Sequence, residues 1–160
     1  MTNAPQTVNN NLSFHGLTGE SRPHPHLTVI ENTDLPRRAL FRMARLIYAE
    51  TRAASLAEIE ALASMVANLV RAGRSLEDMA EDKRLFECLN KSSARHADLL
   101  LRHDSAAMQI CVRTLARALT GVLADQTRGA ARFHRAENLP DWATGVGSVC
   151  EIGNLHFYKW

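Results

Sequence analysis

Glu50 is the residue of this sequence best placed to do chemistry, and it lies near the end of a segment, residues 40–52, with helical periodicity. The apolar residues that would form one core-facing stripe are Leu40, Met43, Ala44 and Ile47. Glu50 continues that stripe at the end of the helix, where partial burial and the negative end of the helix dipole both disfavour a carboxylate. We therefore expect a raised pKa for Glu50, as general-acid catalysis needs. The alternative is an ion pair with Arg45, Arg52 or another basic residue.

A second group of polar side chains lies near the C-terminus, where alternation of apolar and polar residues predicts two strands, 131–135 and 152–159. The residues expected to face the core are Phe133, Leu155 and Phe157. The residues left on the opposite face are His134, His156 and Tyr158. We expect that face to form one wall of a cleft whose other wall is the end of the Glu50 helix.

Helices should position both groups. The first helix is expected to be capped by Asp34, with Pro36 in its first turn. The second helix begins with a capping box formed by Ser55 and Glu58. Small residues on a flank of the second helix leave Asn68 either pointing into a groove or as a surface amide. The remaining helical segments are expected at 75–82, at 94–102, and from Asp104 or Ser105 to a stop at Gly121.

The composition predicts one folded domain in the 160 residues, over 34–160, preceded by a flexible tail over 1–33. His24 and His26 of that tail are two possible metal ligands in a Pro-rich stretch. A net charge of +2 without a polybasic run does not imply nucleic-acid binding, and no apolar window approaches the ~20 residues of a membrane span. The three cysteines have no metal-site spacing, which favours free thiols over one disulfide; they are Cys88, Cys111 and Cys150.

Six blocks of the sequence resemble, in order, the motifs of the SleB-like cell wall hydrolases, the group that includes the spore-cortex-lytic enzymes. The first is Ala-Arg-Leu-Ile-Tyr-Ala-Glu at 44–50, and Phe-Glu-Cys-Leu-Asn at 86–90 is similar to that family's Phe-Ser-Cys-Trp-Asn. The other blocks are 67–70, 123–134, 140–143 and 152–158. The likeness covers about residues 39 to 159 and favours the catalytic interpretation of Glu50 over an ion pair.

The sequence departs from the family motifs at several positions. Leu89 stands where the family has Trp and Leu69 where it has Arg. Gln126 and Arg128 replace Pro and Gly, and Arg132 stands where a His is usual. The motif residues retained are Glu50, Asn68, Thr127, His134, Trp142 and Tyr158. We therefore expect catalysis to be kept and substrate preference to have moved.

The resemblance implies a mostly helical α+β fold, lysozyme-like or lytic-transglycosylase-like, with a small C-terminal antiparallel hairpin. It implies cleavage of peptidoglycan glycan strands at the MurNAc–GlcNAc bond without a cofactor. Glu50 would protonate the glycosidic oxygen and then take the proton of the 6-hydroxyl as an anhydro ring closes. The residues implied in substrate binding are Tyr48, Asn68, Thr127, His134, Trp142, His156 and Tyr158. Asp125 and Asp141 are the candidates for a second carboxylate, although a role as turn residues explains each of them better. If either lay opposite Glu50, hydrolysis would be favoured over ring closure.

Two other functions stay open at this point. A zinc-dependent N-acetylmuramoyl-L-alanine amidase would need His134, His156 and a third ligand, with Glu50 as base. A non-catalytic module that binds glycan or belongs to a phage-like particle would fit the missing Trp at Leu89. The sequence shows no secretory signal, so we expect cytoplasmic synthesis and non-classical export to the periplasm or cell wall. A holin or secretion apparatus would serve as the route, and a neutralising immunity protein is a possible partner.

Overall fold

The computed structural model describes residues 37–101 and 105–159. The α-helices are α1 (Arg37–Thr51), α2 (Leu56–Arg71), α3 (Leu76–Met79), α4 (His96–Leu100) and α5 (Ala106–Leu119). The short 3-10 helices are η1 (Glu87–Leu89) and η2 (Asp141–Ala143), and the strands are β1 (Arg132–Arg135), β2 (Cys150–Ile152) and β3 (Leu155–Tyr158). The predicted tail over 1–33, with His24 and His26, the cap at Asp34 with Pro36, and Asp104 lie outside the described residues, so the predicted domain division stays a prediction.

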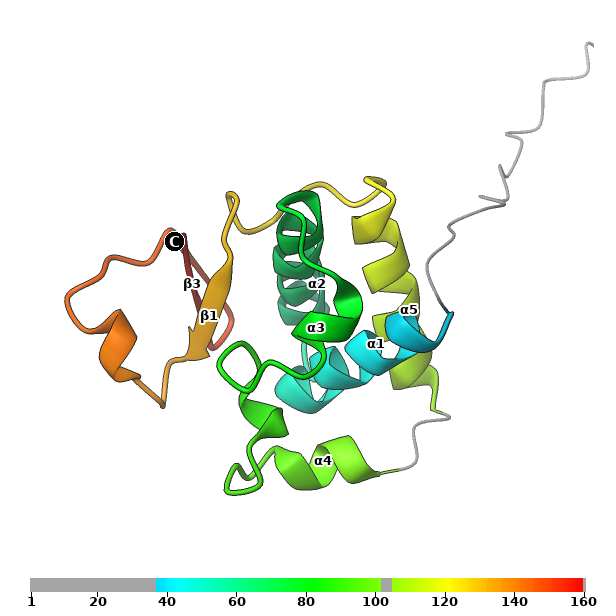
Figure 1. The fold of residues 1–160 in the computed structure, drawn as a ribbon, viewed down its shortest axis with the longest axis horizontal. Coiled ribbons are helices and arrows are strands. Elements are labelled where there is room, and N and C mark those ends of the chain that lie inside the picture. The colour runs from blue at the N-terminus through cyan, green and yellow to red at the C-terminus, as the bar shows by residue number, and fades with distance from the viewer. Residues whose placement is uncertain (1–36, 102–104, 160) are drawn as a thin grey trace, which may run out of the picture. The chain divides into compact units, whose positions relative to one another are not determined.

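Helices α1, α2 and α5 pack on one another and contain most of the core (Figure 1). Helix α2 is the most enclosed of the three, because its small residues leave room for close neighbours; its fully or almost fully buried residues include Ala61, Ala63, Ser64 and Ala67. Ser55, Ser75 and Ser105 cap α2, α3 and α5, each accepting a backbone N–H three residues on. The predicted helices are therefore confirmed where they are described.

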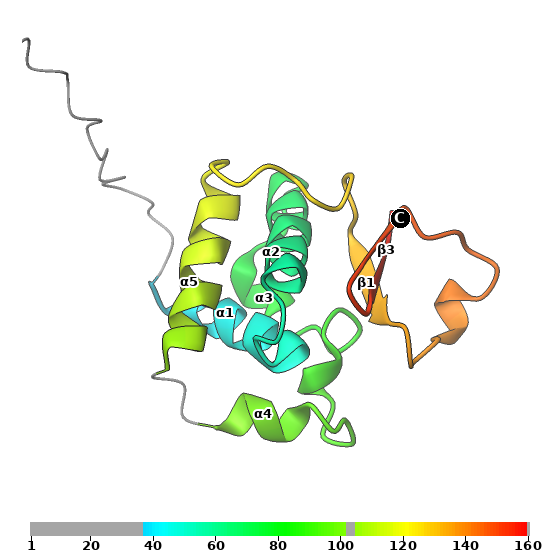
Figure 2. The same ribbon diagram turned by 180° about the vertical axis from the view of Figure 1, so that it is seen from behind.

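The three strands form one antiparallel sheet in the order β1-β3-β2, which lies beside α2 in both ribbon views (Figure 2). Phe133 pairs with Phe157 and His134 with His156, as the predicted strand pair requires. The single strand expected over 152–159 is wrong, because the chain turns at Gly153 and Asn154 and β2 precedes that turn. Gly153 has a positive φ of 59°, which suits a tight hairpin turn.

Glu58 joins the hairpin to α2. Its Oε1 accepts the backbone N–H of Asn154 at 2.8 Å, and a Cβ on Gly153 would lie only 2.3 Å from that oxygen. The expected capping box is therefore only half formed: Ser55 Oγ accepts the Glu58 N–H, but the Glu58 carboxylate serves the sheet.

Helix α1 ends in a backbone conformation that side chains rarely adopt. Arg52 and Ala53 both have φ of 51°, and Thr51 Oγ1 donates to Ile47 O while accepting the Ala53 N–H. This turn stops the helix after Thr51, the residue that follows Glu50. The mostly helical α+β class predicted from the sequence is confirmed, and none of the described helices is long and apolar enough to cross a membrane.

Candidate active site

Glu50 is fully buried in the last turn of α1, deeper than the half-burial expected from the sequence. Its Oε1 accepts the backbone N–H of Cys88, from η1, at 2.7 Å. Its Oε2 is buried with no hydrogen-bond partner among the residues that the structure describes. Arg45 and Arg52, the expected ion-pair partners, bind Leu99 O and Asp98 instead. The carboxyl group is thus held by one oxygen, and the other oxygen is buried without a hydrogen-bond partner among the described residues.

The pKa of Glu50 is raised, as the sequence predicted, and burial is the largest cause. The backbone N–H and the thiol of Cys88 lower that pKa in part. The negative charge of Glu87 raises the pKa further, and the positive charge of Arg135 lowers it. The net direction favours the protonated acid, which is the form that a general acid needs.

Two arginines from outside α1 bind the backbone carbonyl of Glu50. Arg95 Nη1 donates to it at 2.7 Å and Arg135 Nη1 at 2.5 Å. Arg135 also donates from Nε to the Glu137 carboxylate at 2.9 Å and is itself almost completely buried. Both guanidinium groups therefore satisfy and neutralise the negative end of the helix at the residue that carries the acid.

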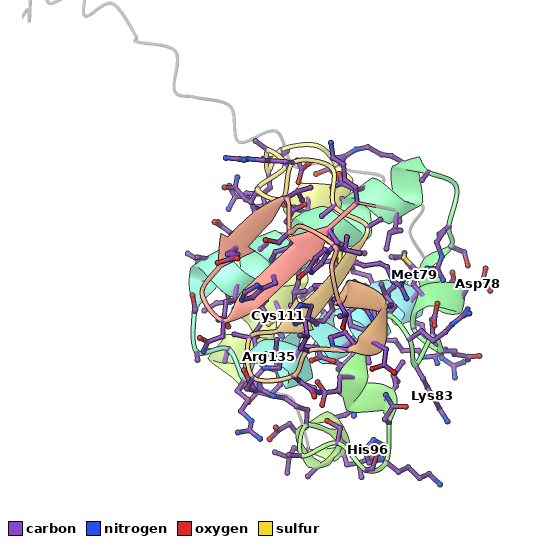
Figure 3. All side chains as sticks on the ribbon, turned by 90° about the vertical axis from the view of Figure 1, so that its left-hand side faces the viewer. Asp78, Met79, Lys83, His96, Cys111 and Arg135 are labelled. Carbon is purple, nitrogen blue, oxygen red and sulfur yellow. The ribbon has the colours of Figure 1, made fainter. Side chains whose placement is uncertain are left out.

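A cleft of about 300 Å³ lies between two walls. One wall is the loop 83–90, and the other is strand β1 together with the segment that follows β1. Glu87 and Arg135, the two charged residues that act on Glu50, both line it, whereas Glu50 does not. Lys83, on the same loop as Glu87, is exposed; Figure 3 views the side that carries Lys83 and Arg135. Glu50 therefore lies behind the cleft wall rather than on its surface.

His134, His156 and Tyr158 form a stack on one face of the sheet. The ring centroids of His134 and Tyr158 are 5.3 Å apart, and those of His134 and His156 are 5.1 Å apart. The Arg135 carbonyl can only accept, so His134 Nδ1 donates to it at 2.7 Å. In the neutral ring Nε2 is then the acceptor, and Tyr158 Oη donates to it at 2.8 Å. Burial raises the pKa of Tyr158, which keeps this donor protonated.

From the sequence we expected this stack to face the end of the first helix across a cleft, and in the structure it does not. Because strand side chains alternate, the β1 residue that reaches Glu50 is Arg135, and His134 projects from the opposite face. His134 still lines the cleft, since the cleft follows the free edge of β1 and takes residues from both faces.

Trp142 joins the stack from η2. Its ring meets His134 and Tyr158 edge-on, at centroid distances of 5.9 and 5.2 Å. The guanidinium of Arg132 lies 4.3 Å from its centroid and covers one face, so a sugar could stack only on the other. Both Trp142 and Arg132 line the cleft.

Five of the predicted site residues do not line the cleft: His156 and Tyr158 of the stack, and Tyr48, Asn68 and Thr127. Asn68 Nδ2 donates to Thr127 Oγ1 and to the carbonyl of Ala130, both at 3.3 Å. Thr127 is fully buried and its Oγ1 donates to Asp125 at 2.7 Å. This network ties α2 to the loop 124–130, and Asp125 has the turn role that was expected for it. Tyr48 packs, half-buried, against the core.

The residues present do not assemble the zinc site that an amidase would need. Within the described residues no group of three His, Cys, Asp or Glu side chains is close enough to hold a metal ion. Both ring nitrogens of His134 are engaged, and His156 Nδ1 lies 3.3 Å from Glu151 Oε1. The three cysteines are free thiols.

Sequence reasoning missed Glu87, Arg95 and Arg135 as parts of this site. Glu87 was visible inside the block 86–90, where it replaces a Ser of the similar motif. The two arginines gave no signal, because their contact with Glu50 joins residues 45 and 85 positions apart.

The fold and the site define a mostly helical α+β domain with a buried acid at a helix end beside a small antiparallel sheet. The structure is similar to the crystal structure of the catalytic domain of the Bacillus cereus SleB protein, with a TM-score of 0.56 and 17% sequence identity. The match covers 81% of this chain and 98% of that domain. No family model and no curated protein matches the sequence.

Proposed function

We propose that this protein cleaves the glycan strand of peptidoglycan at the bond between N-acetylmuramic acid and N-acetylglucosamine, with Glu50 as the general acid. The observation that carries the proposal is the Glu50 carboxyl group, fully buried at a helix end with one oxygen unpartnered. The likeness in fold to the SleB catalytic domain and the neighbouring cleft support it.

The hydrogen bond from Cys88 favours one oxygen of Glu50 as the carrier of the proton. A backbone N–H only donates, and the carbonyl oxygen of a protonated carboxyl group is its better acceptor, so we assign Oε1 as the carbonyl oxygen. The proton is then on Oε2, which has no hydrogen-bond partner among the described residues. We propose that Oε2 donates it to the oxygen of a glycosidic bond; proton transfer of this kind contributes about 10²–10⁴-fold to a rate.

Cleavage begins as Glu50 Oε2 gives its proton to the bridging oxygen while the bond from C1 to that oxygen breaks. The resulting Glu50 carboxylate then accepts a proton, either from the 6-hydroxyl as an anhydro ring closes or from a water molecule that attacks C1. His134, which lines the cleft and is held by Tyr158, is the proposed neighbour of the N-acetyl group, and the Trp142 ring is the proposed stacking surface for a sugar.

The proposal requires the cleft wall to move. Glu50 is 0% exposed, so a glycan in the cleft reaches Oε2 only if side chains of the cleft wall shift. Of the two lining residues that act on Glu50, Glu87 is held by the Ser93 hydroxyl, and Arg135 by the Glu137 carboxylate and the Glu50 carbonyl.

The test is digestion of purified peptidoglycan by the wild type and by Glu50→Gln, with Glu77→Gln, an exposed acid on α3, as the matched control. We expect cleaved glycan from the wild type and the control, and at least ~100-fold less from Glu50→Gln at unchanged circular dichroism. Full activity of Glu50→Gln would overturn the assignment of the acid.

Mass spectrometry of the products separates this function from the other two. Released peptides and sensitivity to a chelator would indicate an amidase, and binding to peptidoglycan without any cut would indicate a non-catalytic module. For this function we propose the periplasm or cell wall as the site of action. A neutralising immunity protein would then be expected to cover the cleft.

A further inference from the structure

Glu87 is the acidic residue of the described chain that lines the cleft beside Glu50. It begins η1, is half-buried, and its Oε1 accepts the hydroxyl of Ser93 at 3.3 Å. The two acids expected from the sequence do not compete with it. Asp125 is occupied by the backbone of its own loop, and Asp141 is exposed and does not line the cleft.

Covalent geometry keeps Glu87 close to Glu50. Cys88 N lies 2.7 Å from Glu50 Oε1. The Cα of Glu87 is about 2.4 Å from that nitrogen, because only the Glu87 carbonyl carbon lies between the two atoms. The Glu87 Cα is therefore within about 5 Å of Glu50 Oε1, and an extended side chain adds about 5 Å more. The two carboxyl groups are thus within about 10 Å of each other, a range that includes the separations found in paired-carboxylate glycosidases.

The two acids have different surroundings, as an acid and a base of one reaction require. Glu50 is fully buried with an unpartnered oxygen, whereas Glu87 is half-buried, open to the cleft and hydrogen-bonded to a hydroxyl. The negative charge of Glu87 also raises the pKa of Glu50. The pair thus consists of one acid buried behind the cleft wall and one that lines the cleft.

We infer that Glu87 is a second catalytic carboxylate, which activates a water molecule so that the protein hydrolyses the glycan instead of closing an anhydro ring. This inference rests on the proposed function. Glu50 Oε2 protonates the bridging oxygen, which leaves C1 with the bonding electron pair. The water oxygen bonds to C1 as Glu87 takes one of its protons, and the net change is the addition of one water molecule across the bond. Exchange with bulk water returns both carboxyl groups to their starting states.

Digestion in heavy-oxygen water tests the inference on the wild-type protein. Hydrolysis introduces the label at each new reducing end, whereas ring closure leaves an unlabelled anhydro sugar. We expect labelled reducing ends to dominate. Cleavage that yields only unlabelled anhydro ends would overturn the role of Glu87 and leave the proposed function intact. The absence of any cleavage by the wild type would overturn the proposed function itself.

Variants of Glu87 provide the second measurement. We expect Glu87→Gln to lose at least ~100-fold in hydrolysis, with its residual products shifted toward unlabelled anhydro ends. Glu87→Asp, which keeps a carboxylate, should recover part of the labelled product, and Glu77→Gln should match the wild type. A purely structural role would lower total cleavage without changing the ratio of labelled to anhydro ends. An unchanged rate and ratio in Glu87→Gln would equally refute the inference.

Discussion

Arg135 Nη1 donates to the backbone carbonyl of Glu50 at 2.5 Å, although 85 residues separate the two in the sequence. Helix α1 has no basic residue in its own last turn, so its negative end depends on cations supplied by other elements. The contact also joins the edge strand β1 to the helix that carries the acid. A single buried arginine thus connects the sheet with the proposed catalytic group.

Arg135→Met should move the pH dependence of cleavage. The positive charge of Arg135 lowers the pKa of Glu50, so its removal raises that pKa further. Because the protonated acid is the active form, we expect the alkaline limb of the kcat/KM profile to shift to higher pH. Arg113→Met, an exposed site on α5, is the control. An alkaline limb that stays in place would show that Arg135 does not act on the catalytic ionisation.

Glu50→Gln should stabilise the protein at neutral and higher pH. The folded-state pKa of Glu50 is raised, so the group favours folding below its ordinary pKa and loses this contribution as pH rises through the raised pKa. Gln has no charge to bury. We expect Tm of the variant to exceed that of the wild type at about pH 8 and to show no such advantage at about pH 4. Equal Tm differences at both pH values would contradict the buried ionisation.

Gly153→Ala should weaken the attachment of the hairpin to α2. The new Cβ would lie 2.3 Å from Glu58 Oε1, and the φ of 59° is unfavourable for Ala. We expect a loss of about 1–3 kcal/mol in the free energy of unfolding, measured with denaturant. Gly147→Ala, with no atom within 4 Å of its Cβ, should cost far less. Similar losses in the two variants would rule out a specific clash with Glu58.

The hydrogen bond between Tyr158 and His134 can be measured by a double-mutant cycle. Tyr158→Phe removes the hydroxyl that lies 2.8 Å from His134 Nε2 in a buried setting. With His134→Ala and the double variant, we expect a coupling energy of about 1 kcal/mol in unfolding experiments. A coupling energy of zero would mean that the stack is held by packing alone.

The three thiols should differ sharply in reactivity. Burial raises the pKa of Cys88 far above its ordinary range and that of Cys111 to about 11, whereas Cys150 is only half-buried. We expect one thiol to react readily with a disulfide reagent in the folded protein and the other two only on unfolding. Cys150→Ser should abolish the fast reaction; a fast reaction that persists would place the accessible thiol elsewhere.

The sequence alone determined the features that depend on local pattern. Helical periodicity placed Glu50 on a buried stripe at a helix end, and serine caps marked the starts of α2, α3 and α5. Strand alternation placed Phe133 and Phe157 on one face and His134 and His156 on the other, as the observed register has them. It misjudged the hairpin only because Gly153 and Asn154 were taken as strand residues and not as a turn.

Only the tertiary structure decided what surrounds the acid. The depth at which Glu50 is buried, its contact with Cys88, and the arginines at its carbonyl all join residues at least 38 positions apart. Local pattern carries no information on such contacts, because they depend on how the elements pack. Because of the same packing, Asn68 and Thr127 lie in a structural hydrogen-bond network and Glu87 lines the cleft.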